Sequence, residues 1–170
     1  MQTSARGFTL IEMMITVAVM SIILAMAVPS FREAIENARL STQVNELVTA
    51  LNAARAEAIR TGRPIWLIAK EDDFNKGWCV RASDDDCGTA SPPDLLDHPA
   101  LDARLKLADT NAPPPPQKPH IAFNRLGALV TPADARTIEI APKICESDSP
   151  KRLIGINAIG RVSVSRDHCS

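Results

Sequence analysis

The sequence predicts an α+β protein in which one long N-terminal helix packs on a small antiparallel β domain. Residues 8–28 are mostly apolar, and a helical spacing of apolar residues continues to residue 61. After Gly62 the pattern changes to short β-type runs separated by turn residues. Several short strands after a single helix favour an antiparallel sheet, or a pair of sheets, packed on that helix. The 170 residues leave room for one such domain beside the apolar segment.

Residues 8–28 are long enough to cross a membrane as a helix. At about 1.5 Å per residue they span about 31 Å, the thickness of a hydrocarbon core. A cleaved secretory signal is the alternative, with Arg6 as its charged region and Ala25-Met26-Ala27 as its cleavage site. Glu12 argues against that alternative, because a charge inside a membrane costs about 2.5 to 3.5 kcal/mol on insertion scales.

Residues 29–61 are expected to continue the helix with one apolar face. That face consists of Leu40, Val44, Leu47, Leu51, Ala54, Ala58 and Ile59. Gly62 follows the last apolar turn and Pro64 comes soon after, which is typical of a helix end. Pro29 removes one backbone donor, so it is expected to kink the helix where the chain leaves the membrane without ending it.

Residues 62–170 are expected to form the β domain. Strands are predicted at residues 65–69, 78–81, 120–124, 137–141, 152–157 and 161–165. We expect Trp66, Trp78, Phe123 and Ile154 in the core. Residues 113–119 contain five prolines, which indicates a stiff extended spacer, with a recognition ligand as the alternative.

The four cysteines are expected to form disulfides. Cys79, Cys87, Cys145 and Cys169 all follow the apolar segment, and an even number beyond an export signal favours bridges over free thiols. Pairing of nearest neighbours is one of three possible connectivities. A zinc site is the alternative, although neither spacing matches the close cysteine pairs of zinc knuckles.

Charge is distributed unevenly along the chain. The net charge of −1 gives no general case for nucleic acid or anionic lipid as a partner. Residues 71–109 nevertheless contain ten acidic and four basic residues, whereas residues 143–170 contain five basic and three acidic residues. Asp84-Asp85-Asp86 lacks the alternating ligands and the glycine of a calcium loop, and we interpret it as a solvated turn.

The sequence contains no recognisable catalytic motif. His98, His120 and His168 lie beside prolines or at the terminus, and there is no nucleophile elbow, metal-binding helix motif or phosphate loop. We therefore expect no enzymatic activity, no metal and no cofactor. An enzyme tethered by a signal anchor is the remaining alternative of that class.

The N-terminal residues resemble a known processing signal. Gly7-Phe8-Thr9-Leu10-Ile11-Glu12, followed by an apolar run and Pro29, is similar to the class III signal of type IV prepilins and type II secretion pseudopilins. The resemblance implies a leader of residues 1–7, cleavage between Gly7 and Phe8 by a prepilin peptidase, and methylation of the new amino terminus. It also implies that Glu12 pairs with the Phe8 amine of a neighbouring subunit and so serves assembly, because a charge pair in hydrocarbon acts as a register device.

Later segments resemble the FimT/GspH group of minor pilins and minor pseudopilins. These segments are LNAARAEAIRTGRPIWLIAK at residues 51–70, IAFNRLGALV at residues 121–130 and LIGINAIGRVSV at residues 153–164. The resemblance implies a pilin-like fold and a structural minor pilin that primes assembly of, or sits at the tip of, a type IV pilus. A minor pseudopilin of a type II secretion system is the alternative. The implied partners are other pilins or pseudopilins and the bacterial inner membrane, with a periplasmic β domain before entry into a filament.

Some members of this group bind DNA, and the resemblance points to a Gly-Arg-x-Arg pattern near the C-terminus. This chain has Gly160 and Arg161, but its next arginine is Arg166, which would lie on the other face of a strand. Fewer phosphate contacts on one face mean weaker binding that is more sensitive to salt. DNA uptake is therefore a further hypothesis, with Lys151, Arg152, Arg161 and Arg166 as its residues.

Overall fold

The computed structural model describes residues 7–89, 93–110, 119–131, 135–147 and 149–169, without the side chains of residues 29, 30, 32 and 131. The predicted leader except Gly7, and the proline-rich segment except Pro119, lie outside these residues. The chain divides into two compact units, Met1–Ala38 and Arg39–Ser170. Each unit is described by itself.

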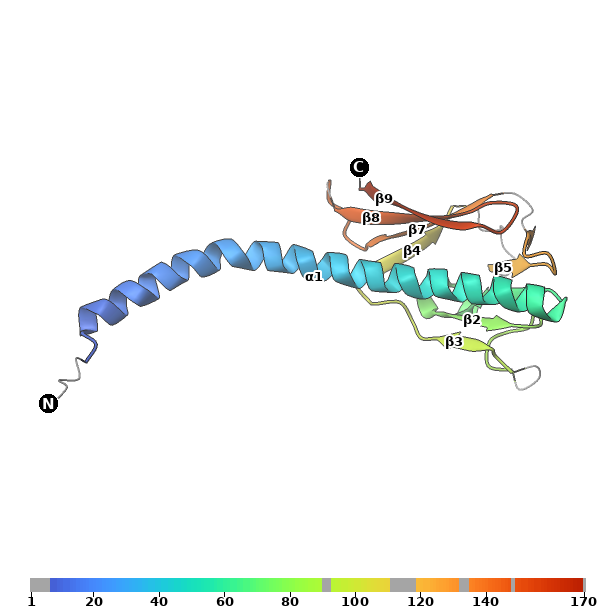
Figure 1. The fold of residues 1–170 in the computed structure, drawn as a ribbon, viewed down its shortest axis with the longest axis horizontal. Helices are drawn as coiled ribbons and strands as arrows, with labels where there is room; N and C mark the ends of the chain where they lie inside the picture. The colour runs from blue at the N-terminus through green and yellow to red at the C-terminus, as the bar shows by residue number, and fades with distance from the viewer. Residues whose placement is uncertain (1–6, 90–92, 111–118, 132–134, 148, 170) are drawn as a thin grey trace, which may run out of the picture. The chain divides into compact units, whose positions relative to one another are not determined.

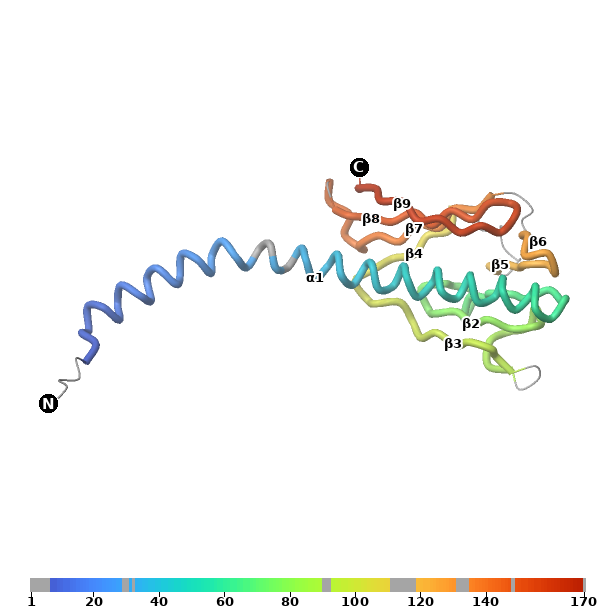
Figure 2. The backbone as a smooth tube through the Cα atoms, in the orientation of Figure 1, coloured from blue at the N-terminus to red at the C-terminus, as the bar shows by residue number. Residues whose placement is uncertain are grey.

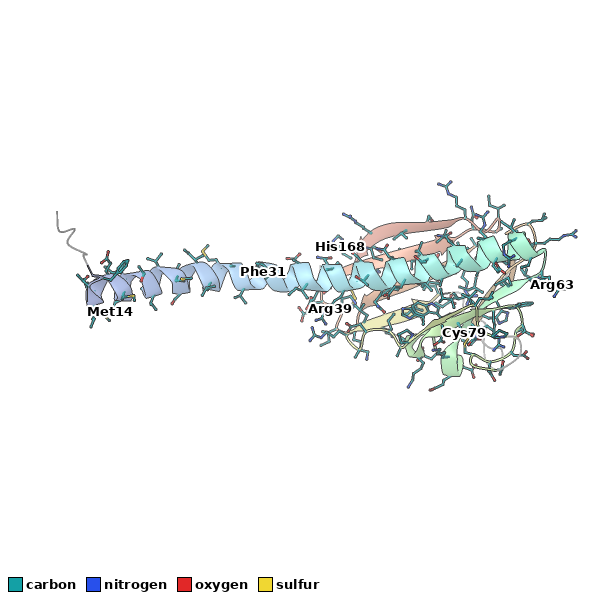
Figure 3. All side chains as sticks on the ribbon, turned by 60° about the horizontal axis from the view of Figure 1, so that its bottom comes forward. Met14, Phe31, Arg39, Arg63, Cys79 and His168 are labelled. Atoms are coloured by element: carbon teal, nitrogen blue, oxygen red, sulfur yellow. A yellow bond between two sulfur atoms is a disulfide. The ribbon has the colours of Figure 1, made fainter. Side chains whose placement is uncertain are left out.

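The first unit is the beginning of helix α1, which spans Leu10–Thr61 (Figure 1). Its large apolar side chains between Leu10 and Val28 are 46 to 80% exposed, and Figure 3 labels Met14 and Phe31 among the uncovered side chains. By length and composition this part of α1 could cross a membrane, with a mean hydropathy of 2.4. The predicted start at Phe8 is two residues early, because Thr9 caps the helix.

In the second unit, the rest of α1 packs against two antiparallel sheets, as the α+β prediction requires. The five-stranded sheet has the order β3 (Leu96–His98), β2 (Trp78–Arg81), β1 (Ile65–Ala69), β5 (His120–Phe123) and β6 (Leu129–Thr131). The four-stranded sheet has the order β4 (Leu105–Asp109), β7 (Arg136–Pro142), β8 (Pro150–Ile156) and β9 (Val162–His168). Short 3-10 turns, η1 (Lys70–Asp72) and η2 (Phe74–Lys76), join β1 to β2. Figure 2 shows β7, β8 and β9 on one side of α1 and β2 and β3 on the other.

The six predicted strands all exist, with ends within three residues of those expected. Strands β3, β4 and β6 were not predicted. β3 and β4 lie in the acid-rich segment, where charged residues interrupt the apolar pattern, and β6 has only three residues. β3 and β4 are held by pairing with β2 and β7, which are distant in sequence, whereas β6 pairs with the neighbouring β5 in a short hairpin.

One apolar core joins α1 to both sheets. Its largest fully buried apolar side chains include Trp78, Phe123, Leu47, Leu51 and Ile138. Two predictions are wrong here. Trp66 is only half-buried. Ile59 is 52% exposed beside the β5–β6 turn, because it lies about 100° around the helix from Ala58, which is fully buried.

The far end of α1 is tied to the turns of two hairpins. Arg55 donates from Nε to the carbonyl oxygen of Gly127 (2.9 Å) and from Nη2 to that of Ile159 (3.3 Å). Gly160 has a φ of 77°, and a Cβ at this position would collide with the carbonyl oxygen of Gly127. The glycine of the Gly160-Arg161 pair therefore has a structural reason, independent of any ligand.

Candidate functional site

The predicted processing and assembly residues lie at the start of α1. Gly7 and Phe8 precede the helix, and Phe8 is 80% exposed. Thr9 and Glu12 form a reciprocal cap: the Glu12 N–H donates to Thr9 Oγ1 (3.3 Å), and the Thr9 N–H donates to Glu12 Oε2 (3.4 Å). In the isolated chain Glu12 thus satisfies a backbone donor at the helix start.

The cap gives Glu12 a second role, which was not predicted from the sequence. A Thr-x-x-Glu spacing before an apolar run is itself a capping-box signature, so this role could have been read from the sequence. The pairing of Glu12 with a neighbouring subunit stays a prediction. Pro29 lies within α1, its side chain is outside the described part, and its predicted kink also stays a prediction.

The four cysteines form two disulfides between nearest neighbours. Cys79 pairs with Cys87, with Cα atoms 5.8 Å apart, and Cys145 pairs with Cys169, with Cα atoms 5.6 Å apart. The first closes a loop at the end of β2, and the second holds the end of β9 to the segment that follows β7. No described cysteine is left as a metal ligand.

Much of the acid-rich segment supplies counter-charges within the fold. Asp97 pairs with Lys70 (2.6 Å), Asp102 with Arg39 (3.5 Å), Asp94 with buried Arg81 (3.4 Å) and Asp109 with buried Arg136. A fifth acid, Asp73, caps η2 by accepting the Asn75 N–H (2.9 Å). Asp84-Asp85-Asp86, by contrast, is exposed, as expected of a solvated turn. The segment is therefore largely structural.

The four basic residues of the DNA hypothesis do not form one patch. Lys151 Nζ lies 3.4 Å from both Glu139 Oε2 and Asp167 Oδ2 and is neutralised between them. Arg152 and Arg166 face each other across the β8–β9 ladder on one face of the sheet. Arg161 precedes β9 and, by the alternation of side chains, belongs to the opposite face. DNA binding stays a prediction.

Comparisons with known proteins agree with this arrangement. The family model described as "Type II transport protein GspH" matches residues 43–160. The chain belongs to the GspH family. A second model, "Prokaryotic N-terminal methylation motif", matches residues 3–28. The resemblance inferred from the sequence is thereby confirmed, and this GspH-family chain has the predicted pilin-like fold.

Two solved structures share the fold of this GspH-family chain. The type IV minor pilin FimU of Pseudomonas aeruginosa has 25% sequence identity and a TM-score of 0.60, covering 79% of this chain and 98% of FimU. The minor pseudopilin EpsH of the Vibrio cholerae type 2 secretion system has 16% identity and a TM-score of 0.54, covering 75% of this chain and 96% of EpsH; this likeness shows the fold alone.

A curated relative of this GspH-family chain is a "Fimbrial protein" of Pseudomonas aeruginosa, 40% identical over 68 residues. That match covers 40% of this chain and 44% of the relative. The chain thus spans less than half the length of the curated relative it matches.

The ion pair between Lys151 and Asp167 contributes to shifts in the pKa values of both groups. The His168 backbone N–H, which donates to the Asp167 carboxylate, is the main cause that lowers the pKa of Asp167, and Lys151 adds to it. Desolvation is the largest single influence on Lys151, but Glu139 and Asp167 together outweigh it and raise the pKa of Lys151.

Replacing Lys151 should raise the pKa of Asp167 without restoring it fully. We expect Lys151→Met to leave the His168 hydrogen bond, so the pKa of Asp167 should move only part of the way to its ordinary value. Because the pKa is lowered in the folded protein, the stabilising effect of Asp167 is present above the ordinary carboxylate pKa and is lost as pH falls through the folded pKa. NMR titration of the carboxyl carbon measures it, with Lys151→Arg as the matched control. An unchanged pKa in Lys151→Met would contradict the ion pair.

Proposed function

We propose that this chain is a minor pilin that primes assembly of, or sits at the tip of, a type IV pilus. The similarity to FimU carries this proposal, because it extends over 98% of FimU and has higher identity and TM-score than the similarity to EpsH. The "Fimbrial protein" relative supports the same choice.

In this proposal the N-terminal segment is first an anchor and then an assembly element. A prepilin peptidase removes residues 1–7 by cleavage between Gly7 and Phe8, as the methylation-motif match supports. Residues 8–28 then hold the chain in the bacterial inner membrane as a single span, with residues 29–61 and the β domain of residues 62–170 in the periplasm. Extraction into the filament brings the exposed apolar side chains of α1 against those of other major and minor pilins.

A minor pseudopilin of a type II secretion system is the alternative proposal. It is favoured by the description of the matching family model, which covers 118 residues of this chain (43–160). In either filament we propose a structural role without catalysis or a cofactor, since the described acids and disulfides hold the fold together.

Deletion of the gene tests this proposal and separates its two versions. We expect the deletion strain to lose surface pili and twitching while secreted enzymes stay at normal levels, and full-length protein to restore pili. Surface pili and twitching report on the type IV pilus, and secreted enzymes report on the type II secretion system. Loss of secretion with intact pili would support the pseudopilin. Normal pili and normal secretion together would contradict both versions.

A further inference from the structure

Three of the four sheet edges in the described part of the chain are short or closed. β3 and β6 have three residues each. On β4, the register with β7 leaves the N–H and C=O of Leu107 directed outward, and the Asn75 side chain bonds both. Asn75 Oδ1 accepts the Leu107 N–H (2.8 Å), and Asn75 Nδ2 donates to the Leu107 carbonyl (3.0 Å). Such protection is expected, because an open edge invites pairing with another chain.

The seven-residue strand β9 is the exception. At the two ends of the β8–β9 hairpin, the Asn157 N–H donates to the Arg161 carbonyl (3.1 Å), and the Cys169 N–H donates to the Ser149 carbonyl (2.9 Å). Both contacts use odd-numbered residues, and bonded and non-bonded pairs alternate in an antiparallel ladder. The odd-numbered residues of β9 therefore bond to β8, and the even-numbered residues direct their backbone groups away from it.

The outward groups of β9 are largely open. They belong to Val162, Val164, Arg166 and His168. Only the N–H of His168 is used, by the Asp167 carboxylate (2.9 Å), and no described residue bonds the outward groups of the other three. The fold thus closes the β4 edge of this sheet with an amide side chain and leaves the β9 edge available.

We propose that the β9 edge binds an extended, acidic strand of a different subunit of the same filament. The proposal rests on the filament role proposed above. Addition of a strand to a sheet edge is an established mode of peptide recognition, in which main-chain hydrogen bonds supply affinity and side chains supply specificity. Here the outward N–H and C=O groups of Val162, Val164 and Arg166 would supply the main-chain bonds.

Charge identifies the kind of strand that fits. Arg161 and Arg166 are exposed, lie on opposite faces of the sheet, and have no acidic partner among the described residues. An added strand also alternates its side chains between the two faces, so acidic residues on both faces would meet one arginine each. Asp167, on the same face as Arg161, is paired with Lys151, which it shares with Glu139. This cluster therefore keeps one negative charge near the end of β9, and the acidic residue of the donor belongs opposite Arg161.

A second copy of this chain fits the edge less well. Figure 1 shows β9 lying roughly along the axis of the adjoining part of α1 within the second unit, with the opposite chain direction. Antiparallel pairing of β9 with β9 of another copy would set those helix segments in opposite directions. Subunits drawn from one membrane enter a filament with one polarity, so the antiparallel donor must be a different strand.

A proline at Val164 tests the edge without cutting the hairpin. The N–H of Val164 points away from β8, so Val164→Pro removes only an outward donor. In cells that make the filament, p-benzoyl-L-phenylalanine at exposed Ser165 of the full-length chain should form an adduct with another filament subunit. We expect Val164→Pro to lower the adduct yield by about tenfold or more, since an unmade hydrogen bond and the ring both oppose pairing. Val164→Ala, which keeps the N–H, should retain the adduct.

Charge reversal gives a second measurement that does not depend on proline. Arg161→Glu with Arg166→Glu should lower the adduct yield comparably, and Arg63→Glu, an exposed residue on the β1 side of the fold, should leave it unchanged. Thermal unfolding and a test for intact disulfides check that each variant is folded. If Val164→Pro is not folded, the adduct yield of the charge-reversal variant decides the proposal. An adduct that survives charge reversal, or the absence of any adduct with a filament subunit, would overturn the proposal. If the deletion strain lacks pili but folded Val164→Pro protein restores them with the adduct intact, the edge proposal alone fails.

Duplex DNA is the competing ligand for the same arginines. Mobility shifts with purified full-length protein in detergent at about 50 mM salt measure its binding. Retardation that is lost in an Arg161→Ala, Arg166→Ala double variant, with an unchanged subunit adduct, would assign the arginines to DNA and overturn the edge proposal. Loss of the adduct in that variant without any DNA retardation would support it.

Discussion

A Glu12→Ala protein should be processed at its N-terminus but should not enter filaments. Glu12 is exposed at the start of an uncovered apolar helix, where a carboxylate needs a partner once water is excluded. We propose that the partner is the Phe8 amine of a neighbouring subunit. Breaking a buried charge pair costs about 3 to 5 kcal/mol, so incorporation should fall by about a hundredfold or more. Quantitative immunoblots of sheared filaments measure it, against total processed protein in membranes.

A Glu12→Gln variant separates the charge from the helix cap. Glutamine can still bond the Thr9 N–H as glutamate does, but it carries no charge. If the charge is what assembly needs, Glu12→Gln should fail to the same degree as Glu12→Ala. Normal incorporation of Glu12→Gln would mean that the Thr9 cap, and not an intermolecular ion pair, is the function of this residue. Normal incorporation of both variants would contradict any assembly role.

Replacement of Arg136 should be the most destabilising change in the β domain. Arg136 is fully buried in β7, donates from Nε to Asp109 Oδ2 of β4 (2.7 Å), and also donates to the carbonyl oxygen of His120 in β5. It therefore links the two sheets. Arg136→Met takes the guanidinium away from the buried Asp109 carboxylate, which should lower the free energy of unfolding by about 3 to 5 kcal/mol. Urea unfolding of the full-length protein in detergent, followed by Trp fluorescence, measures the change.

The double variant Arg136→Met, Asp109→Leu is the control for this result. Removing both charges replaces the ion pair with apolar groups, a change that is often neutral or even stabilising in protein interiors. We expect it to recover most of the stability that Arg136→Met loses. A double variant as unstable as Arg136→Met would show that the lost hydrogen bond to His120, rather than the lost ion pair with Asp109, dominates the effect.

The helix and most strands could be predicted because their signals are local. The spacing of Leu40, Val44 and Leu47 indicates one buried face, and all three are buried. β1 begins and ends where its apolar run does, and β2 extends one residue beyond its run, to Arg81. Ile59 was also expected on this face but is exposed, because it lies about 100° around the helix from the fully buried Ala58, and periodicity does not fix the width of the buried face.

The rest depends on partners that are far away in the sequence. β4 has the sequence LKLAD, too short an alternation of apolar and charged residues to stand out, and Leu105 and Leu107 are buried because β7 and Asn75 hold the strand in place. The ion pairs of the acid-rich segment were likewise not predicted, since nothing local shows that Asp109 will meet Arg136, 27 residues away. The position of Arg166 on the face opposite Arg161 did follow from the sequence, since strand alternation is local.

The Asn75 side chain determines how many edges of the four-stranded sheet are open to another strand. Because the β4 edge is closed and the β9 edge is open, the four-stranded sheet can be extended by a strand on one side only. Without the amide, the sheet would have two reactive ends of opposite strand direction, and copies could join head to tail without limit. If β9 takes up a strand as proposed above, the Asn75 side chain limits this sheet to one added strand.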